Sequence, residues 1–234
     1  MSVFVIQANI GAGKTSLLQQ LKTLTFEKPH VILFEQVDEW TKYKDKDGND
    51  ILNLFYKDQE KYSYVFQTYV LFSRISYMLK TIKENPNSII ICERCHLTDL
   101  YVFAQSLYEQ GKLTDIEINT YRLWHGKLRD MFNIKISGVI YLKTDPETCL
   151  TRIHLRSRTA ENTIGIEYLE HLHRKHEEWL SDRPKLDSSV EYYKLEKDQD
   201  FPVLTIDGNV DIYNYPERTK QLEKIVKFIN VESM

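Results

Sequence analysis

Residues 3–18 read VFVIQANIGAGKTSLL, an apolar run that breaks into a glycine-containing turn ending in Gly-Lys-Thr. In such a turn, successive backbone N–H groups and the free N–H groups of the following helix form a concave site for anions. Gly13, Lys14 and Thr15 fit the pattern G-x-x-x-x-G-K-[ST], in which the lysine reaches nucleotide phosphates and the hydroxyl ligates Mg²⁺. Ala8 replaces the first glycine, so the strand end must tolerate a methyl group. The other residues expected to bind the phosphates are Gly11, Ala12 and Ser16.

The composition sets limits on the kind of protein. A chain of 234 residues with 42% hydrophobic content suits one α/β domain over residues 1–234. A net charge of −3 provides no global basic field for nucleic acid, so we expect no nucleic-acid partner. Uninterrupted apolar runs such as 89–92 and 100–104 are far below the roughly 20 residues that cross a bilayer, so we expect no membrane segment. The first strand begins near Val3 without a leader pattern, which predicts cytoplasmic residence.

Three cysteines do not form a disulfide scaffold, which suits a reducing compartment. Residues 92–96 match the C-x-x-C-H pattern of haem attachment and could begin a zinc site. Cys92, however, closes the run SIIIC and is interpreted as a small buried hydrophobe, and no second ligand pair follows at metal spacing. His171, His173 and His176 lack a H-E-x-x-H pattern and are expected on a charged, solvent-facing side of a helix.

Continuous apolar runs and helical periodicity alternate along the chain. Strands are expected near 3–7, 31–35, 88–92, 138–143 and 202–206, and helices near 15–26, 58–84, 97–110, 115–131, 146–158, 164–180 and 215–230. Strands that are buried on both faces give continuous apolar runs, which is typical of a parallel sheet covered by helices. The sequence therefore predicts an α/β fold with a five-stranded parallel sheet flanked by helices.

Two predicted strands end in carboxylates, Glu35 on the second and Glu93, followed by Arg94, on the third. Ligands of open parallel sheets bind at the carboxyl ends of the strands. On the helix 58–84, Gln67 and Arg74 share one face, while Tyr62, Phe66, Tyr69, Phe72 and Ile75 are expected to face the core. A solvated loop carboxylate and a solvent-facing polar pair remain the plain alternatives for Glu35 and for Gln67 with Arg74.

Arg152, Arg156 and Arg158 lie within two helical turns of one another. Guanidinium groups match phosphate oxygens geometrically, so these residues predict an anion clamp. The alternative is a solvated basic face paired with Glu161 and Glu167. Asp99, early in its helix, could equally be a carboxylate favoured by the helix dipole.

Several motifs taken together resemble one known family. They are ANIGAGKT, EQVDEW at 35–40, FQTY at 66–69, ERCHLTDLYVFA at 93–104, and RIHLRSR followed by EYLEHLHRKHEEWL. In this order they resemble the deoxynucleoside kinases, the cellular and viral group that includes deoxycytidine and deoxyguanosine kinases. The match runs from the first strand to about residue 211. Cys95 departs from it, because serine is more usual there.

The resemblance implies roles for the candidate residues. Glu35 takes the proton of the nucleoside 5′-hydroxyl, and Arg94 holds the 5′ region and the transferring phosphate. Glu93 either ligates Mg²⁺ beside Thr15 or binds one of the ligands of the ion. Tyr56 and Glu161 are implied to bind the sugar 3′-hydroxyl. The residues implied around the acceptor base are Gln67, Phe103, Trp40, Arg74 and Asp99. The three arginines are implied to form a lid over ATP at about 152–163, with Asp211 near the donor base. The resemblance also implies a homodimer.

The implied reaction is transfer of the γ-phosphate of ATP to the 5′-hydroxyl of a deoxynucleoside. Arg74 with Asp99 resembles the deoxycytidine and deoxyguanosine kinase branch, which predicts deoxycytidine and purine deoxynucleosides ahead of thymidine. Two other classes stay open. A nucleoside monophosphate kinase shares the loop and lid but needs cations for the acceptor phosphate, which Glu35 would repel. A nucleotide-binding regulator without catalysis needs no base.

Overall fold

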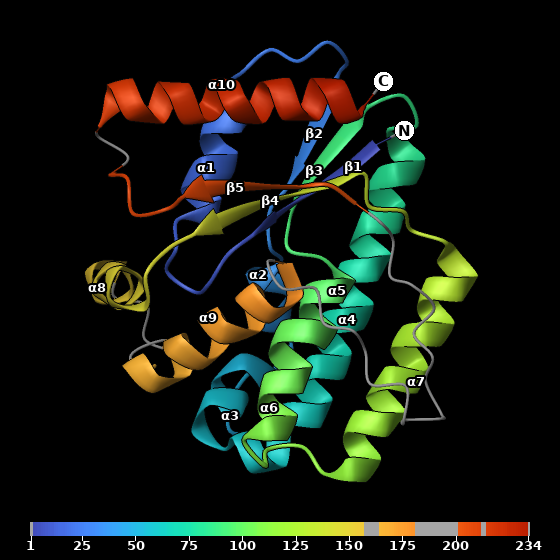
Figure 1. Cartoon of the computed structure of the whole chain (residues 1–234). Helices are drawn as coiled ribbons and strands as arrows, with labels where there is room; N and C mark the ends of the chain where they lie inside the picture. Colours follow the sequence, from blue (N-terminus) through green and yellow to red (C-terminus); the bar gives the residue numbers. More distant parts are fainter. Residues whose placement is uncertain (1, 157–163, 181–200, 212–213, 234) are drawn as a thin grey trace.

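The computed structural model describes residues 2–156, 164–180, 201–211 and 214–233. Five strands form one parallel sheet in the order β2-β3-β1-β4-β5 (Figure 1). Their bounds are β1 Ser2–Gln7, β2 His30–Leu33, β3 Ile89–Glu93, β4 Gly138–Lys143 and β5 Val203–Asp207. The predicted five-stranded parallel sheet is confirmed.

The central strand β1 pairs with β3 on one side and β4 on the other, with Phe4 opposite Ile91 and Gly138. Both neighbours are buried almost throughout, as the continuous apolar runs predicted. Because all five strands run in one direction, their carboxyl ends lie along one edge of the sheet.

Helices cover both faces of the sheet (Figure 1). Helices α1 and α10 lie on one face, and α4 to α7 and α9 lie on the other. The helix bounds are α1 Lys14–Leu21, α2 Val37–Trp40, α3 Ile51–Lys57, α4 Gln59–Glu84, α5 His96–Thr98, α6 Gln105–Glu109, α7 Asp115–Phe132, α8 Pro146–Arg156, α9 Ile166–Leu180 and α10 Tyr215–Glu232. A π-helical segment, η1 Asp99–Ala104, joins α5 to α6.

Some local expectations were wrong. The second strand ends at Leu33, so Glu35 lies in the loop beyond it, and the short helices α2 and α3 were not foreseen. On α4, Phe72 is 41% exposed instead of facing the core, whereas Gln67 and Arg74 are buried. His176 was expected at the surface but is fully buried. Among the described helices, none is long and apolar enough to span a membrane.

Candidate active site

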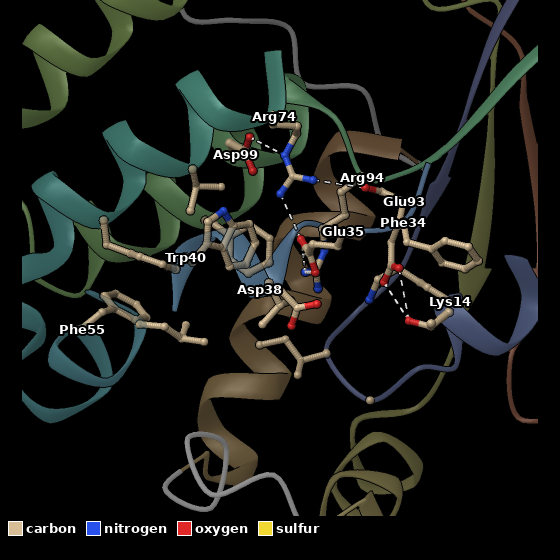
Figure 2. Close-up of a pocket in the computed structure, with 18 of the residues that line it drawn as sticks. Lys14, Phe34, Glu35, Asp38, Trp40, Phe55, Arg74, Glu93, Arg94 and Asp99 are labelled. Atoms are coloured by element: carbon tan, nitrogen blue, oxygen red, sulfur yellow. Dashed lines mark hydrogen bonds and ion pairs between the residues drawn. The ribbon is translucent and has the colours of Figure 1, made fainter. Parts of the chain in front are cut away.

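A cavity of about 350 Å³ opens at the carboxyl ends of β1, β2 and β3 (Figure 2). Its floor is the phosphate loop, and its walls come from the segment after β2, from α3, α4 and η1, and from α9. The lining residues include Ile10, Gly11, Lys14, Thr15, Phe34, Glu35, Asp38, Trp40, Leu52, Phe55, Tyr56, Phe66, Gln67, Val70, Arg74, Glu93, Arg94, Asp99, Phe103, Arg156 and Tyr168. Most of the predicted acceptor residues therefore share one cavity with the phosphate loop.

The phosphate loop adopts a conformation that requires glycine. Gly11 and Gly13 have φ angles of 76° and 95°, and a Cβ on Gly11 would lie 2.4 Å from the carbonyl oxygen of Cys149. Ala8, by contrast, is fully buried, so its methyl group packs into the core.

Lys14 lies inside the loop, buried, with Nζ donating to the carbonyl oxygens of Asn9 at 2.8 Å and Ala8 at 3.4 Å. Burial and the neighbouring Arg94 lower the pKa of Lys14 to about 8. Its ammonium is bonded to neutral carbonyl groups, so phosphate oxygens would be stronger partners.

Two oxygen ligands suited to Mg²⁺ stand beside the lysine. The hydroxyl Oγ1 of Thr15 donates to Glu93, 3.1 Å from Oε2 and 3.3 Å from Oε1. A hydroxyl and a carboxylate fit a hard divalent cation that is otherwise held by waters and phosphates. The predicted pair Thr15 and Glu93 is therefore together in the structure.

Glu35 is bound by two arginines (Figure 2). Arg94 Nη1 lies 2.7 Å from Oε2 and 2.9 Å from Oε1, and Arg74 Nη2 lies 2.9 Å from Oε1. Burial raises the pKa of Glu35, but Arg94, Arg74 and Lys14 lower it more, to about 2. The carboxylate is thus held ionised at the entrance to the phosphate loop. The interpretation of Glu35 as a solvated loop carboxylate is wrong.

Arg74 connects Glu35 to Asp99. Its Nε donates to Asp99 Oδ2 at 2.8 Å, and its Nη1 donates to the carbonyl oxygen of Glu93 at 3.1 Å. Burial raises the pKa of Asp99 and Arg74 opposes this, with a net pKa of about 6. The other oxygen, Oδ1, has no hydrogen-bond partner within the described ranges. This free acceptor belongs to a side chain that lines the cavity.

Unusual backbone geometry carries three side chains of the cavity wall. Arg94 has a φ of 60°, a left-handed conformation that is uncommon for a residue with a Cβ and is concentrated at functional sites. The π-helical segment η1 carries Asp99 and Phe103. Such segments frequently mark functional sites, because they locally change where side chains point.

Aromatic rings complete the wall opposite the phosphate loop. The guanidinium carbon of Arg94 lies 4.8 Å from the centre of the Phe103 ring. Trp40 packs edge-on against Phe66, with ring centres 5.7 Å apart, and donates its Nε1 hydrogen to Ser73. Buried Gln67 presents the amide of this wall.

The predicted lid is only partly seen. Arg156 lines the cavity, but Arg158 and Glu161 lie outside the described residues. Arg152 donates from Nη1 to the carbonyl oxygens of Ala12 at 3.2 Å and Gly208 at 2.8 Å, so it binds the backbone of the phosphate loop and of the segment after β5. Asp211 is exposed and is not among the residues that line the cavity.

Sequence reasoning missed several residues of the site. Asn9, Asp38, Phe55 and Tyr168 were not singled out, although Asn9, Asp38 and Tyr168 lie inside motifs that were quoted. Asp38 lies three residues after Glu35, which is a signal that the sequence offers. Phe55 gave no such signal, because a single aromatic residue in a helix usually packs in the core.

Comparisons with known proteins identify the family of this chain. A family model described as deoxynucleoside kinase matches residues 4–230. Deoxycytidine kinase of Homo sapiens is 34% identical over 243 residues, covering 96% of this chain and 90% of the relative. A probable deoxycytidine kinase of Fowlpox virus (strain NVSL) is 34% identical over 226 residues, covering 96% and 87%. Mitochondrial deoxyguanosine kinase of Xenopus laevis is 30% identical over 238 residues, covering 95% and 87%. The chain therefore belongs to the deoxynucleoside kinase family, whose members phosphorylate nucleosides with ATP.

Proposed function

We propose that this kinase transfers the γ-phosphate of ATP to the 5′-hydroxyl of a deoxynucleoside and prefers deoxycytidine and purine deoxynucleosides to thymidine. The observation that carries the proposal is the Arg74 guanidinium, which joins the carboxylate at the phosphate loop, Glu35, to the carboxylate deep in the cavity, Asp99. One end of this chain of contacts suits a sugar hydroxyl and the other suits a base edge.

At the donor side, Lys14 and the N–H groups of residues 11–16 would bind the ATP phosphates. Arg152, Arg156 and Arg158 would add cations over them, and Asp211 would lie toward the donor base. Arg152 must leave its carbonyl partners, or use its remaining N–H groups, to reach a phosphate. The loop, the lysine and the arginines together neutralise the charge that spreads over the transferring group.

At the acceptor side, Glu35 would accept the hydrogen bond of the 5′-hydroxyl and then its proton. A carboxylate with a pKa of about 2 is a weak base, but it is ionised at any working pH. Phosphoryl transfer depends mainly on position and charge, so a weak base that orients the hydroxyl is sufficient. Arg94, bound to the same carboxylate, would hold the transferring phosphate. Tyr56 and Glu161 would bind the 3′-hydroxyl.

Thr15 and Glu93 would hold Mg²⁺ together with the donor phosphates. When bound, the ion supplies positive charge to the phosphate oxygens. The protein's own contribution is to keep a hydroxyl and a carboxylate within 3.1 Å of each other at the start of α1.

The base would lie between Phe103 and the Trp40 side of the cavity, with its edge toward Gln67 and Asp99. An amide pairs with any base edge by turning over, so Gln67 discriminates little. The free Oδ1 of Asp99 accepts a hydrogen bond from the amino group of cytosine or adenine and opposes the carbonyl oxygen of thymine. A mispaired buried polar group costs about 1–3 kcal/mol, which predicts a preference of roughly 10- to 100-fold in kcat/KM.

Competition among the four deoxynucleosides tests this preference. Arg74→Met with Asp99→Ala should raise thymidine use. The two are changed together because Arg74→Met alone would leave Asp99 buried without its cation, and Asp99→Ala alone would leave the Arg74 guanidinium in the cavity, still bound to Glu35. Preference of the unaltered protein for thymidine would show that the base-pocket assignment is wrong.

We also propose that two copies associate through α4 and α7, which pack against each other (Figure 1). These helices expose large apolar side chains, which are Val65, Phe72, Ile116, Leu123, Trp124 and Met131. A solvent-exposed apolar set of this size on neighbouring helices is typical of an interaction surface. Cytoplasmic residence stays a prediction.

A further inference from the structure

Asn9 is a buried polar residue of the phosphate loop to which the motif assigns no role. It is 3% exposed, and both ends of its carboxamide are bonded. Oδ1 accepts the backbone N–H of Ile10 at 2.8 Å, and Nδ2 donates to the carbonyl oxygen of Leu169 at 2.8 Å. The second bond crosses from the loop to α9, a helix 160 residues further along the chain.

The backbone of the same residue holds the lysine. The carbonyl oxygen of Asn9 accepts Lys14 Nζ at 2.8 Å and the N–H of Ala12 at 3.4 Å. Its side chain and its backbone therefore fix different partners: the side chain binds α9, and the carbonyl group binds the ammonium. A change in the side-chain bonds would rotate or shift the peptide whose oxygen positions Lys14.

Helix α9 is also part of the acceptor wall. Tyr168, next to Leu169 in the sequence, lines the cavity that holds Glu35 and Arg94. The Asn9 bond thus links the loop that would bind the donor to the helix that borders the acceptor. Transfer between two substrates requires their reacting atoms to be placed within a few tenths of an ångström, so such a link matters for rate.

We infer that Asn9 is a positioning residue, whose carboxamide fixes the phosphate loop against α9 and so sets the place of Lys14 relative to the donor phosphates. The inference rests on the proposed function, because it takes the loop to be the ATP site. Asn9 is not among the residues that line the cavity. It acts through the peptide that binds Lys14 and through the Leu169 carbonyl group.

Two substitutions separate the bonds. Asn9→Ala removes both bonds of the side chain. Asn9→Asp keeps the oxygen that accepts from Ile10 but places a second oxygen against the Leu169 carbonyl oxygen, where no hydrogen bond forms. Thr144→Val is the matched control, because the buried Thr144 Oγ1 shares its hydrogen between the carbonyl oxygen of Leu142 at 3.4 Å and another carbonyl oxygen of the phosphate loop, that of Ala12 at 3.5 Å.

Steady-state kinetics with ATP and deoxycytidine, together with calorimetric binding of ATP, tests the inference. Both Asn9 variants should raise the KM and the Kd for ATP about 10-fold or more and lower kcat, while the KM for deoxycytidine and the values for Thr144→Val stay within about two-fold. A merely structural role would lower the melting temperature and raise both KM values together. ATP binding within two-fold of the unaltered protein in both Asn9 variants would overturn the inference.

The proposed function and the role of Asn9 are tested by different measurements. If the unaltered protein transfers no phosphate to any deoxynucleoside, the function is wrong. The calorimetric comparison of ATP binding between the Asn9 variants and Thr144→Val still decides the role of Asn9, because it needs no turnover.

Discussion

Replacing Glu35 by glutamine changes one carboxylate oxygen into an amide nitrogen at the centre of the site. That carboxylate accepts three hydrogen bonds from Arg94 and Arg74, at 2.7, 2.9 and 2.9 Å. The amide keeps one acceptor oxygen for a guanidinium and for the 5′-hydroxyl, but it cannot take up a proton. The expected fall in kcat is about 10²- to 10⁴-fold, the range for loss of a general base.

The same change also affects stability. Arg74 keeps Asp99 as its counter-ion, whereas Arg94 loses the only carboxylate with which it forms an ion pair among the described residues. A buried ion pair broken on one side costs about 3–5 kcal/mol, and the free energy of unfolding should fall by an amount of this order. A melting curve must therefore accompany every rate, so that loss of folded protein is not mistaken for loss of chemistry.

Single-turnover measurement with saturating ATP and deoxycytidine isolates the chemical step. Glu39→Gln, the same chemical change four residues along, is the control, because the Glu39 carboxylate pairs only with the exposed Lys42 at 3.7 Å among the described residues. The control should stay within about two-fold. If Glu35→Gln weakens nucleoside binding while single-turnover chemistry stays fast, Glu35 only positions the substrate and the reasoning about the base is refuted.

Three other predictions follow from the same structure. Lys14→Ala should lower kcat/KM by about 10²-fold or more through lost charge stabilisation in the transition state, and near-normal turnover in a steady-state assay would contradict the phosphate-loop assignment. Burial lowers the pKa values of His96, His125 and His176 to about 3, 4 and 3 from an ordinary 6.5. Between the folded-state pKa values and 6.5, the unfolded chain binds more protons than the folded chain. The free energy of unfolding is therefore full above pH 6.5 and falls as the pH is lowered, by about 2 kcal/mol per histidine at pH 5. An equal urea midpoint at pH 7 and pH 5 would refute this. Leu123→Glu should convert a dimer to a monomer in light scattering, and a protein that is monomeric before the change would disprove the α4–α7 interface.

The sheet could be predicted because its strands are buried on both faces. Runs such as residues 89–92 are continuously apolar, and loops and surface helices rarely contain such runs. The phosphate loop could be predicted for a similar reason, since its spacing needs a strand before it and a helix after it. Both expectations rest on local sequence.

The acceptor side depended on contacts that no local pattern shows. Gln67 and Arg74 are polar residues on the buried face of α4, and hydropathy places such residues at the surface. Only the closeness of three chain segments makes Arg74 a partner of both Glu35 and Asp99. For Arg152 a local pattern was present but the contacts differ from it. Its spacing with Arg156 suggested a lid, whereas its guanidinium is bonded to backbone carbonyl groups.

The surface of α4 was misjudged for the same reason. Phe72 fits the helical period of the aromatic stripe, yet the buried side of the helix is set by where α3, α7 and η1 lie. Periodicity finds an apolar face but does not say whether the sheet or another molecule covers it.

ATP consumption with deoxynucleosides, compared with their 5′-monophosphates, tests the central claim most directly. Ionised Glu35 lines the cavity, and under the proposed function its negative charge lies where the phosphate of a monophosphate acceptor would have to enter. We predict rapid ADP formation with deoxycytidine and purine deoxynucleosides, and turnover with the monophosphates at least about 100-fold lower in kcat/KM. Faster turnover with a monophosphate, or ATP binding without transfer to any of these acceptors, would contradict the account.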